Sequence, residues 1–352
     1  MIDKEQLKAA LDILTVVAPS KTTMPILKYL LLKTDGNKLA ITANNLAQAL
    51  TIFVDQSDEE INTCLPANEL KLILQTVKSE TVRFKQSDHK IVLCDGKHRT
   101  TFKTLDVEKF PVTETVIPQF NIDGGILKTY IEQAQISCAI DESRGILTSV
   151  NLLSKNGIFI AQASDGFRAS LTKMMLGTDD FNVSIPAPHV KILQLFAGSL
   201  SLHIAENTVY IFSDDFQYTT QLKAGQFPFI ENFLPTHKNI TATINKSSML
   251  NAIKRAMVFA KNTDNIISFN FNDGILNVFS EDNTGKNAME FEIDQDGQQQ
   301  ISIAANGNFI QDILKLAKNN IIIEMIDATS PIVFKIPEQE TFTYILMPMN
   351  IK

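Results

Sequence analysis

The sequence predicts an α+β fold made of three copies of one domain, each with two helices and a sheet of mostly antiparallel strands. Two observations predict it. Amphipathic helical patterns recur at regular intervals along the chain, and short strands separated by turn residues follow them. At 352 residues the chain is also longer than a single ordinary hydrophobic core supports, so more than one domain is expected.

The first helix of each copy carries apolar residues at spacings of three and four. Leu7, Leu127 and Leu250 hold the same place in this pattern. They are 120 and 123 residues apart, so the pattern repeats with an almost constant period. We expect these helices over residues 4–17, 124–138 and 246–261.

The second helix of each copy follows a stretch with strand character. Pro66 and Pro186 stand near the start of two of these helices, 120 residues apart, where proline is tolerated. The third copy begins near Ala304. We expect these helices over residues 67–79, 187–197 and 305–318.

Strands and turns complete each copy, and they place the domain boundaries. Short strands separated by turn residues follow each second helix. The boundaries should then fall near residues 112–119 and 235–240. This predicts three domains, over residues 1–115, 116–238 and 239–352. Unrelated segments with chance periodicity are the alternative, but two landmarks that recur in one order argue against it.

The composition is that of a soluble globular protein, with 44% hydrophobic and 20% charged residues. No apolar run is long enough to span a bilayer, and the first residues lack the pattern of a signal peptide, so we expect no membrane partner. The three cysteines, Cys64, Cys94 and Cys138, are far apart, which favours buried thiols over disulfides or a zinc site.

Charge is distributed unevenly between the expected elements. The chain has a net charge of −7, but the six expected helices hold twelve basic and five acidic residues, a net charge of +7, which leaves −14 elsewhere. Helices on one side of the molecule would attract the phosphates of a nucleic acid without sequence preference. Lysines on ordinary solvated helix faces are the alternative. The candidate DNA-facing residues of these segments are Lys8, Lys71, Lys78, Lys128, Lys191, Lys254, Arg255 and Lys318.

A search for catalytic and cofactor motifs finds none that would define an enzyme. The five histidines do not pair at metal-ligand spacing, and neither a Walker loop nor a dinucleotide-binding glycine motif occurs. Asp165, in "ASDGFR", is typical of a turn. We therefore expect a binding or scaffold protein without cofactor, metal or catalytic residues. An enzyme whose groups meet only in the folded chain stays open as an alternative.

Seven segments match one protein family in order and spacing. They are "TTMPILKYLLL" (22–32), "FPV" (110–112), "ESRGIL" (142–147), "ASDGFRASL" (163–171), "FPFIENFLP" (227–235), "SPIVFKIP" (330–337) and the terminal "YILMPMNIK". Together they resemble the bacterial sliding clamp, the β subunit of DNA polymerase III, from residue 1 to residue 352. That family is built from three similar domains.

The resemblance implies a fold and a function. Two protomers would close head to tail into a homodimer ring, with helices lining the hole and strands outside. The ring would encircle double-stranded DNA and slide on it, in the cytoplasm and on the nucleoid, with no catalytic activity. Its partners would be the DNA polymerase III α subunit, the clamp loader, and other polymerases and repair proteins. Lys21 and Arg144 match further DNA-facing positions, although Arg144 is also open to a structural role.

The resemblance also implies a pocket for short apolar peptides carried by these partners. Some of its residues, notably Leu147, Ile345 and Leu346, could instead belong to the core. The positions that match the family's pocket are Leu147, Ser164, Gly166, Phe167, Arg168, Ala169, Pro228, Asn232, Phe233, Thr329, Pro331, Ile345, Leu346, Met347, Pro348, Met349 and Asn350.

Several residues depart from the family's pattern. Asn232 and Asn350 stand where arginine is frequent, and Phe167 replaces a frequent histidine. We expect a less basic, more apolar rim that relies less on an acidic residue in the peptide. Met347 and Met349 suit contacts with several ligands, because the thioether side chain adapts its shape. A diverged clamp-like scaffold, which binds peptides without encircling DNA, remains the alternative function.

Overall fold

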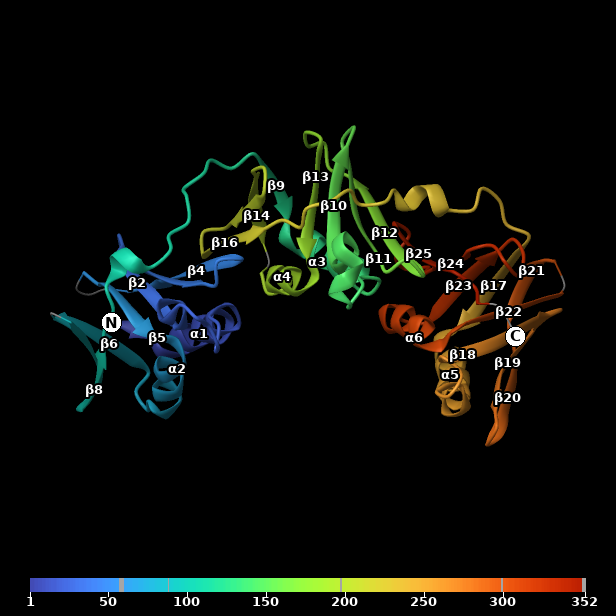
Figure 1. Ribbon diagram of the computed structural model, residues 1–352, viewed down its shortest axis with the longest axis horizontal. Helices are drawn as coiled ribbons and strands as arrows, with labels where there is room; N and C mark the ends of the chain where they lie inside the picture. Colours follow the sequence, from blue (N-terminus) through green and yellow to red (C-terminus); the bar gives the residue numbers. More distant parts are fainter. Residues whose placement is uncertain (57–59, 88, 197, 299, 350–352) are drawn as a thin grey trace. The chain divides into compact units, whose positions relative to one another are not determined.

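The computed structural model describes residues 1–56, 60–87, 89–196, 198–298 and 300–349. The chain divides into two compact units (Figure 1). The first unit consists of Met1–Gly125 and Leu195–Leu222, and the second unit of Ile126–Gln194 and Lys223–Lys352.

One order of elements occurs three times along the chain: a short strand, a helix, four strands, a second helix and three strands. The first copy runs through β1 (Ile2–Asp3), α1 (Lys4–Val17), β2 (Tyr29–Asp35), β3 (Lys38–Asn44), β4 (Gln48–Asp55), β5 (Asn62–Pro66), α2 (Ala67–Thr76), β6 (Thr81–Ser87), β7 (Lys90–Asp95) and β8 (His98–Lys103). The second runs through β9 (Phe120–Asp123), α3 (Gly124–Gln135), β10 (Ser149–Lys155), β11 (Ile158–Ser164), β12 (Arg168–Met175), β13 (Phe181–Pro186), α4 (Ala187–Leu193), β14 (Ser199–Ile204), β15 (Thr208–Phe212) and β16 (Phe216–Gln221).

The third copy has one additional short strand. It runs through β17 (Ile240–Asn245), α5 (Lys246–Ala260), β18 (Ile266–Asn272), β19 (Ile275–Asp282), β20 (Gly285–Glu292), β21 (Asp294–Gly297), β22 (Gln300–Asn306), α6 (Gly307–Leu316), β23 (Asn320–Met325), β24 (Ile332–Lys335) and β25 (Phe342–Leu346). The described connections contain four 3₁₀ helices of one or two turns: η1 (Pro25–Lys28), η2 (Val107–Lys109), η3 (Glu142–Thr148) and η4 (Ile230–Phe233).

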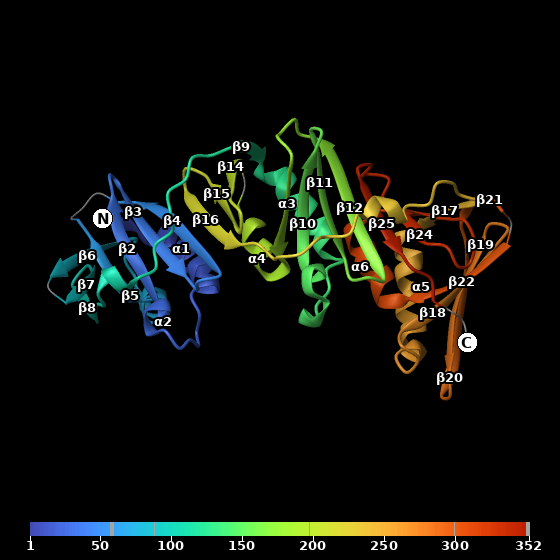
Figure 2. The same ribbon diagram turned by 45° about the horizontal axis from the view of Figure 1, so that its top comes forward.

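In the part of the chain that the structure describes, the strands form four sheets, and every described pairing of neighbouring strands is antiparallel. The first unit holds the sheets β1-β6-β7-β8 and β5-β2-β3-β4-β16-β15-β14-β9. The second unit holds β20-β19-β18-β22 and the nine-stranded sheet β13-β10-β11-β12-β25-β24-β23-β17-β21. In the nine-stranded sheet β25 pairs with β12, so the end of the chain joins strands of its middle (Figure 2). The predicted α+β class, with helices and antiparallel sheets, is confirmed.

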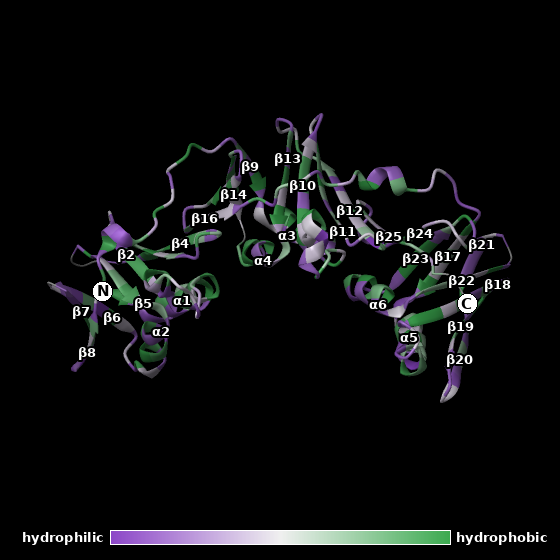
Figure 3. Ribbon diagram, in the orientation of Figure 1, coloured by the Kyte–Doolittle hydropathy of each residue, from purple (hydrophilic) through white to green (hydrophobic). Residues whose placement is uncertain are grey.

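Three helices, α1, α5 and α6, begin where a side chain satisfies free backbone N–H groups, whereas α2 and α4 begin after Pro66 and Pro186 without a side-chain cap. Asp3 accepts a hydrogen bond from the Gln6 N–H at 2.8 Å, and Asn245 and Asn306 cap α5 and α6 in the same way. Each of the helices has hydrophobic and hydrophilic stretches (Figure 3). In α1 the buried residues are spaced three and four apart from Leu7 onward, which confirms the predicted apolar spacing of this helix.

Several helices are shorter than their apolar patterns predict. α2 ends at Thr76 instead of residue 79, because Val77 is already extended with φ −64° and ψ 130°. α6 ends at Leu316 for the same reason at Ala317. Lys78, Lys261 and Lys318 therefore lie outside the helices, which hold nine basic and five acidic residues. Their net charge is +4 and not the expected +7.

The core of the second unit is built on one side of its sheets. Phe269, Phe271, Phe334 and Tyr344 are almost completely buried there and pack with the apolar sides of α5 and α6. Strand residues alternate between this core and the opposite face, as the period of two requires. That opposite face of β12, β25, β24 and β23 carries the cavities described below.

The described thiols behave as buried groups. Cys64 and Cys138 are buried and Cys94 is half-buried, and all three are free. Burial raises the pKa of Cys138 to about 12 and the pKa of Cys64 to about 11, so both stay protonated near neutral pH.

Candidate functional site

A cavity of about 260 Å³ opens on the second unit, and we call it the apolar pocket. Its walls come from η3, the turn between β11 and β12, the segment around η4, and the end of β25. The lining residues are Leu147, Ser164, Gly166, Phe167, Arg168, Ala169, Pro228, Ile230, Phe233, Ile345 and Met347.

The floor of the apolar pocket is continuous with a small buried cluster. Ala169 of β12 faces Ile345 of β25 in the strand register, and both belong to a cluster with Leu171, Phe227 and Ile230. The floor is therefore fixed by packing between strands that are far apart in the sequence. A rigid apolar floor suits a ligand that presents apolar side chains.

The rim of the apolar pocket exposes large apolar side chains. Phe167 is 53% exposed, Phe233 54% and Met347 39%. Exposed apolar groups that gather around one cavity mark a binding surface more often than isolated ones do. Met347 adds a flexible side chain that can adapt to different ligands.

Hydrogen bonds hold the turn between β11 and β12. Asp165 Oδ1 accepts from the N–H of Phe167 at 2.9 Å and from the N–H of Arg168 at 3.0 Å. Ser164 Oγ accepts from the N–H of Gly166 at 3.0 Å and donates to the Arg168 carbonyl at 2.8 Å. Gly166 has φ +89°, which other residues rarely adopt. Asp165 thus acts as the turn former that its sequence context predicts.

Arg168 is buried behind this turn and its charge is fully partnered. Its Nε donates to Asp165 at 2.9 Å, and a terminal nitrogen donates to Asp312 of α6 at 2.7 Å. The guanidinium also lies 4.1 Å from the ring centre of Phe309. Burial acts to lower the pKa of Arg168, but the Tyr344 hydroxyl and the carboxylates outweigh it, and the pKa is raised.

A second cavity, of about 380 Å³, shares Phe167 and Met347 with the apolar pocket, and we call it the tail pocket. The end of the chain is held there by its backbone. The N–H of Met347 donates to the Phe167 carbonyl at 2.9 Å, and the N–H of Met349 donates to the Ala304 carbonyl at 2.7 Å. The lining residues are Phe167, Asp264, Asn306, Phe309, Met347, Pro348 and Met349.

The two cavities bring together twelve of the seventeen residues expected at the pocket. Ten line the apolar pocket, and Pro348 and Met349 line the tail pocket. Ile230 was not among the expected residues. Its apolar neighbours in "FPFIENFLP" gave a signal for the segment but not for the side that each residue would face.

Four expected residues do not line either cavity. Leu346 is 1% exposed and packs in the core, because it alternates with Ile345 along β25. Thr329 and Pro331 lie in the turn before β24, where Asp327 accepts from the Thr329 N–H. Asn232 is exposed on η4. Asn350 lies outside the described residues.

Three family models match the chain in sequence. They are the N-terminal, central and C-terminal domains of the DNA polymerase III beta subunit, at residues 1–114, 121–229 and 231–350. The chain belongs to the DNA polymerase III beta subunit family. Its relatives include the beta sliding clamps of Buchnera aphidicola, 24% identical with 93% of this chain and 92% of the relative covered, and of Streptococcus pneumoniae, 25% identical with 94% and 93% covered.

Solved structures of beta subunits have the same fold as this chain. The beta subunit of Thermotoga maritima is 20% identical, with a TM-score of 0.90 and 100% of this chain and 99% of that chain covered. A sliding clamp from Pseudomonas aeruginosa, bound to griselimycin, is 21% identical, with a TM-score of 0.94 and 99% and 98% covered.

The basic residues expected to face DNA differ in their surroundings in this beta subunit. The Nζ of Lys71 lies 2.8 Å from Asp12 Oδ1, and the Nζ of Lys8 lies 3.7 Å from Glu5 Oε2. These acidic neighbours partly offset the two positive charges. Lys21, Lys128, Lys191, Lys254 and Arg255 are exposed. Lys78 and Lys318 are exposed beyond helix ends. Arg144 lies on η3, with its guanidinium 5.2 Å from the ring centre of Phe167.

None of the helices in the described part of the chain is long and apolar enough to cross a membrane. Within the same residues, no three His, Cys, Asp or Glu side chains are grouped so that they could hold a metal ion.

Proposed function

We propose that this beta subunit is a DNA sliding clamp. Two copies close head to tail into a ring around double-stranded DNA, with helices toward the hole and strands outside. The ring tethers a polymerase without chemistry of its own. Membership of the family carries this proposal, and the threefold order of elements supports it, because repeated domains are the natural parts of a closed ring.

The proposed domains run over residues 1–115, 116–238 and 239–352. The first family model ends at residue 114, next to the first proposed boundary, and the third begins at residue 231, eight residues before the proposed third domain. The same order of elements begins again after each of the two inner boundaries.

The decisive experiment is retention on DNA of different topology. A ring should stay on nicked circular DNA, after loading by a clamp loader, and leave once the circle is cut. Equal retention on circular and linear DNA would contradict encirclement. In solution the protein should have a mass near twice 39.2 kDa, and a stable monomer would contradict ring closure.

A clamp-like scaffold that binds peptides without DNA is the second candidate. The described helices carry a net charge of only +4, and Lys8 and Lys71 are partly offset by acidic neighbours. This arrangement weakens the attraction to phosphate that the first candidate needs. A protein that binds partner peptides but leaves circular DNA as fast as linear DNA would favour the scaffold.

We also propose that the apolar pocket and the tail pocket receive short apolar peptides of polymerases, the clamp loader and repair proteins. Phe233→Ala should weaken binding of such a peptide about tenfold or more, because it removes a large exposed side chain from the rim. Phe229→Ala is the matched control: Phe229 is 44% exposed in the same segment but does not line the pocket. Equal losses in both variants, measured by fluorescence anisotropy, would contradict this role.

The apolar rim supports a shifted peptide preference. Phe167 and Met347 dominate the boundary between the two cavities, and Asn232 adds no charge nearby. Peptides with and without an acidic residue among the positions that fill these two cavities should bind with similar affinity. If removing the acidic residue lowered peptide affinity as much as it does for a clamp with a basic rim, the proposed preference would be contradicted.

A further inference from the structure

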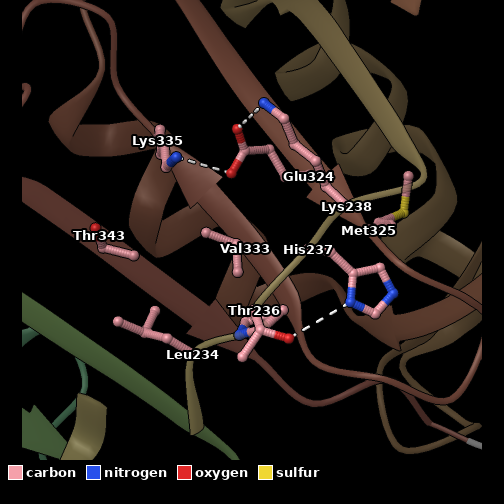
Figure 4. A pocket seen from close by; sticks show the side chains of 10 residues that line it. Leu234, Thr236, His237, Lys238, Glu324, Met325, Val333, Lys335 and Thr343 are labelled. Carbon is pink, nitrogen blue, oxygen red and sulfur yellow. Dashed lines mark hydrogen bonds and ion pairs between the residues drawn. The ribbon is translucent and has the colours of Figure 1, made fainter. Parts of the chain in front are cut away.

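A groove of about 380 Å³ lies beside η4, between the chain segment 234–238 and the strands β23, β24 and β25 (Figure 4). We call it the linker groove. Unlike the apolar pocket it is lined by charged, hydroxyl and apolar groups together. The lining residues are Leu234, Pro235, Thr236, His237, Lys238, Glu324, Met325, Val333, Lys335 and Thr343.

Three charged side chains stand together in the linker groove. The Nζ of Lys238 lies 2.6 Å from Glu324 Oε1, and the Nζ of Lys335 lies 2.8 Å from Glu324 Oε2 (Figure 4). Glu324 is 13% exposed, whereas the lysine side chains are 53% and 45% exposed. One carboxylate therefore holds two ammonium groups at the surface of the groove, with a net charge of +1.

The two ammonium groups keep hydrogen-bonding capacity beyond Glu324. Each ammonium has three N–H donors, and the bond to Glu324 uses one of them. The hydroxyl groups of Thr236 and Thr343 are further polar groups of the lining. A net positive charge with free donors favours a carboxylate-bearing ligand over a cationic one.

The linker groove and the apolar pocket lie on one face of the same sheet. Ile345 lines the pocket, and Thr343, two residues earlier on β25, lines the groove. Val333 of the groove is the direct partner of Ile345 in the pairing of β24 with β25. Leu234 lines the groove and also packs against the cluster beneath the pocket, so it stands between the two.

We propose that the linker groove binds an acidic residue of the same partner peptide whose apolar residues fill the apolar pocket. This inference rests on the proposed peptide-binding function and adds a charge-reading subsite to it. The acid would be recognised by Lys238 and Lys335, on the side of the pocket away from Met347 and the tail pocket. It would be distinct from any acidic residue that faces the apolar rim.

The spacing follows from the strand between the two cavities. Thr343 and Ile345 are two positions apart on β25, a distance of about 7 Å along a strand. An extended peptide covers about 3.3–3.6 Å per residue. The acidic residue should therefore stand about two to four positions from the nearest apolar residue in the pocket.

The test uses the full-length protein and a set of fluorescent peptides that share one apolar segment. Each peptide carries glutamate or glutamine at one position, two to four residues beyond the apolar segment on either side. At the matching position the glutamate peptide should bind about fivefold more tightly than the glutamine peptide, the scale of one partly exposed charge pair. The preference should shrink as salt is raised from about 50 mM to about 500 mM.

Variants assign the preference to the linker groove. Lys238→Ala/Lys335→Ala and Lys335→Glu each change the net charge of the linker groove from +1 to −1, because Glu324 remains. In both variants the glutamate peptide should lose its advantage and bind no more tightly than the glutamine peptide. Lys286→Ala is the matched control, since Lys286 is an equally exposed lysine paired with Glu281 elsewhere in the second unit. Circular dichroism checks that each variant is folded.

The outcomes separate this inference from the function on which it rests. If the glutamine peptides bind but glutamate gives no gain at any position, the apolar pocket works and the charge-reading subsite is wrong. A glutamate preference that persists in the double lysine variant also overturns it. If no peptide binds the wild-type protein, the peptide-binding function itself fails.

Discussion

Arg168 connects three parts of the second unit through one buried guanidinium. It pairs with Asp165 in its own turn and with Asp312 on α6, and it approaches the Tyr344 hydroxyl on β25 at 3.5 Å. Because the turn also supplies Gly166 and Phe167 to the cavities, the geometry of the binding surface depends on an ion pair that no ligand needs to touch. The resemblance placed Arg168 at the pocket, and Arg168 does line it, but the sequence could not show that its guanidinium is buried and paired with two carboxylates.

Removing this side chain should be costly. Arg168→Ala leaves Asp165 and Asp312 without their buried partner, so we expect a loss of about 3–5 kcal/mol in the free energy of unfolding. Arg144→Ala should lower the free energy of unfolding by less than about 1 kcal/mol. Arg144 is exposed, and its guanidinium lies over the Phe167 ring. Urea denaturation measures both. Similar losses in the two variants would contradict a special role for Arg168.

Glu324 should make the stability of the folded protein depend on pH. Burial acts to raise its pKa, but hydrogen bonds from Lys238 and Lys335 outweigh burial, and its pKa lies below the ordinary value of 4.5. A lowered pKa stabilises the folded state above the ordinary value, and this stabilisation is lost as the pH falls through the lowered pKa.

The free energy of unfolding should therefore differ most between wild type and Glu324→Gln near neutral pH. The difference should shrink below pH 4.5. Glu340→Gln, at an exposed position before β25, is the control substitution and should change the free energy of unfolding little. A constant difference between wild type and Glu324→Gln over this pH range would contradict the linkage.

At the scale of elements, the sequence predicted the existence of the helices better than their ends. Apolar spacing located all three first helices, since burial of one side sets that spacing. The last turns of α2 and α6 were lost because backbone conformation at Val77 and Ala317 depends on packing that spacing does not encode. The same limit explains Leu346: the resemblance located β25, and the register with β12 decided which residues face the pocket.

The last element makes a prediction about the tail. A chain that ends after Leu346 keeps β25 intact, including its pairing with β12 and β24. It loses Met347, Pro348 and Met349, and with them the wall that the apolar pocket shares with the tail pocket. We expect peptide binding to fall at least tenfold, while the protein remains folded and retains its oligomeric state.

Two measurements on the truncated chain test this prediction: peptide affinity by titration, and the temperature of thermal unfolding. A large drop in the unfolding temperature would show that residues after β25 belong to the core, which is the alternative interpretation of this apolar end. Met347→Ala alone should give a smaller loss of peptide affinity and no change in unfolding.

For the whole molecule, the order of elements was predictable and the distribution of charge only in part. The repeat follows from local patterns that recur three times, and it survives changes in individual residues. The summed net charge of the six helices depends on where each helix ends, so it is +4 and not the expected +7. The neighbours of Lys71 could not be read from the sequence either, because Asp12 lies on a different helix.

The exposed pair on α5 tests the role of the whole molecule. Lys254→Glu/Arg255→Glu changes the charge of one helix by four units at exposed positions. If the helices face DNA, the lifetime on circular DNA should fall and its salt dependence should weaken. Lys286→Glu, on β20, should leave the lifetime unchanged. Equal effects of the two changes would contradict a DNA-facing α5.

The pairing of β12 with β25 has a consequence for the protein during its synthesis. Arg168 faces Leu346 in this pairing, so the apolar pocket needs two strands that are far apart in the sequence and are therefore made at different times. A chain whose synthesis stops before β25 lacks the strand that closes the pocket. Under the proposed peptide-binding function, such a chain should not compete with the complete protein for partner peptides.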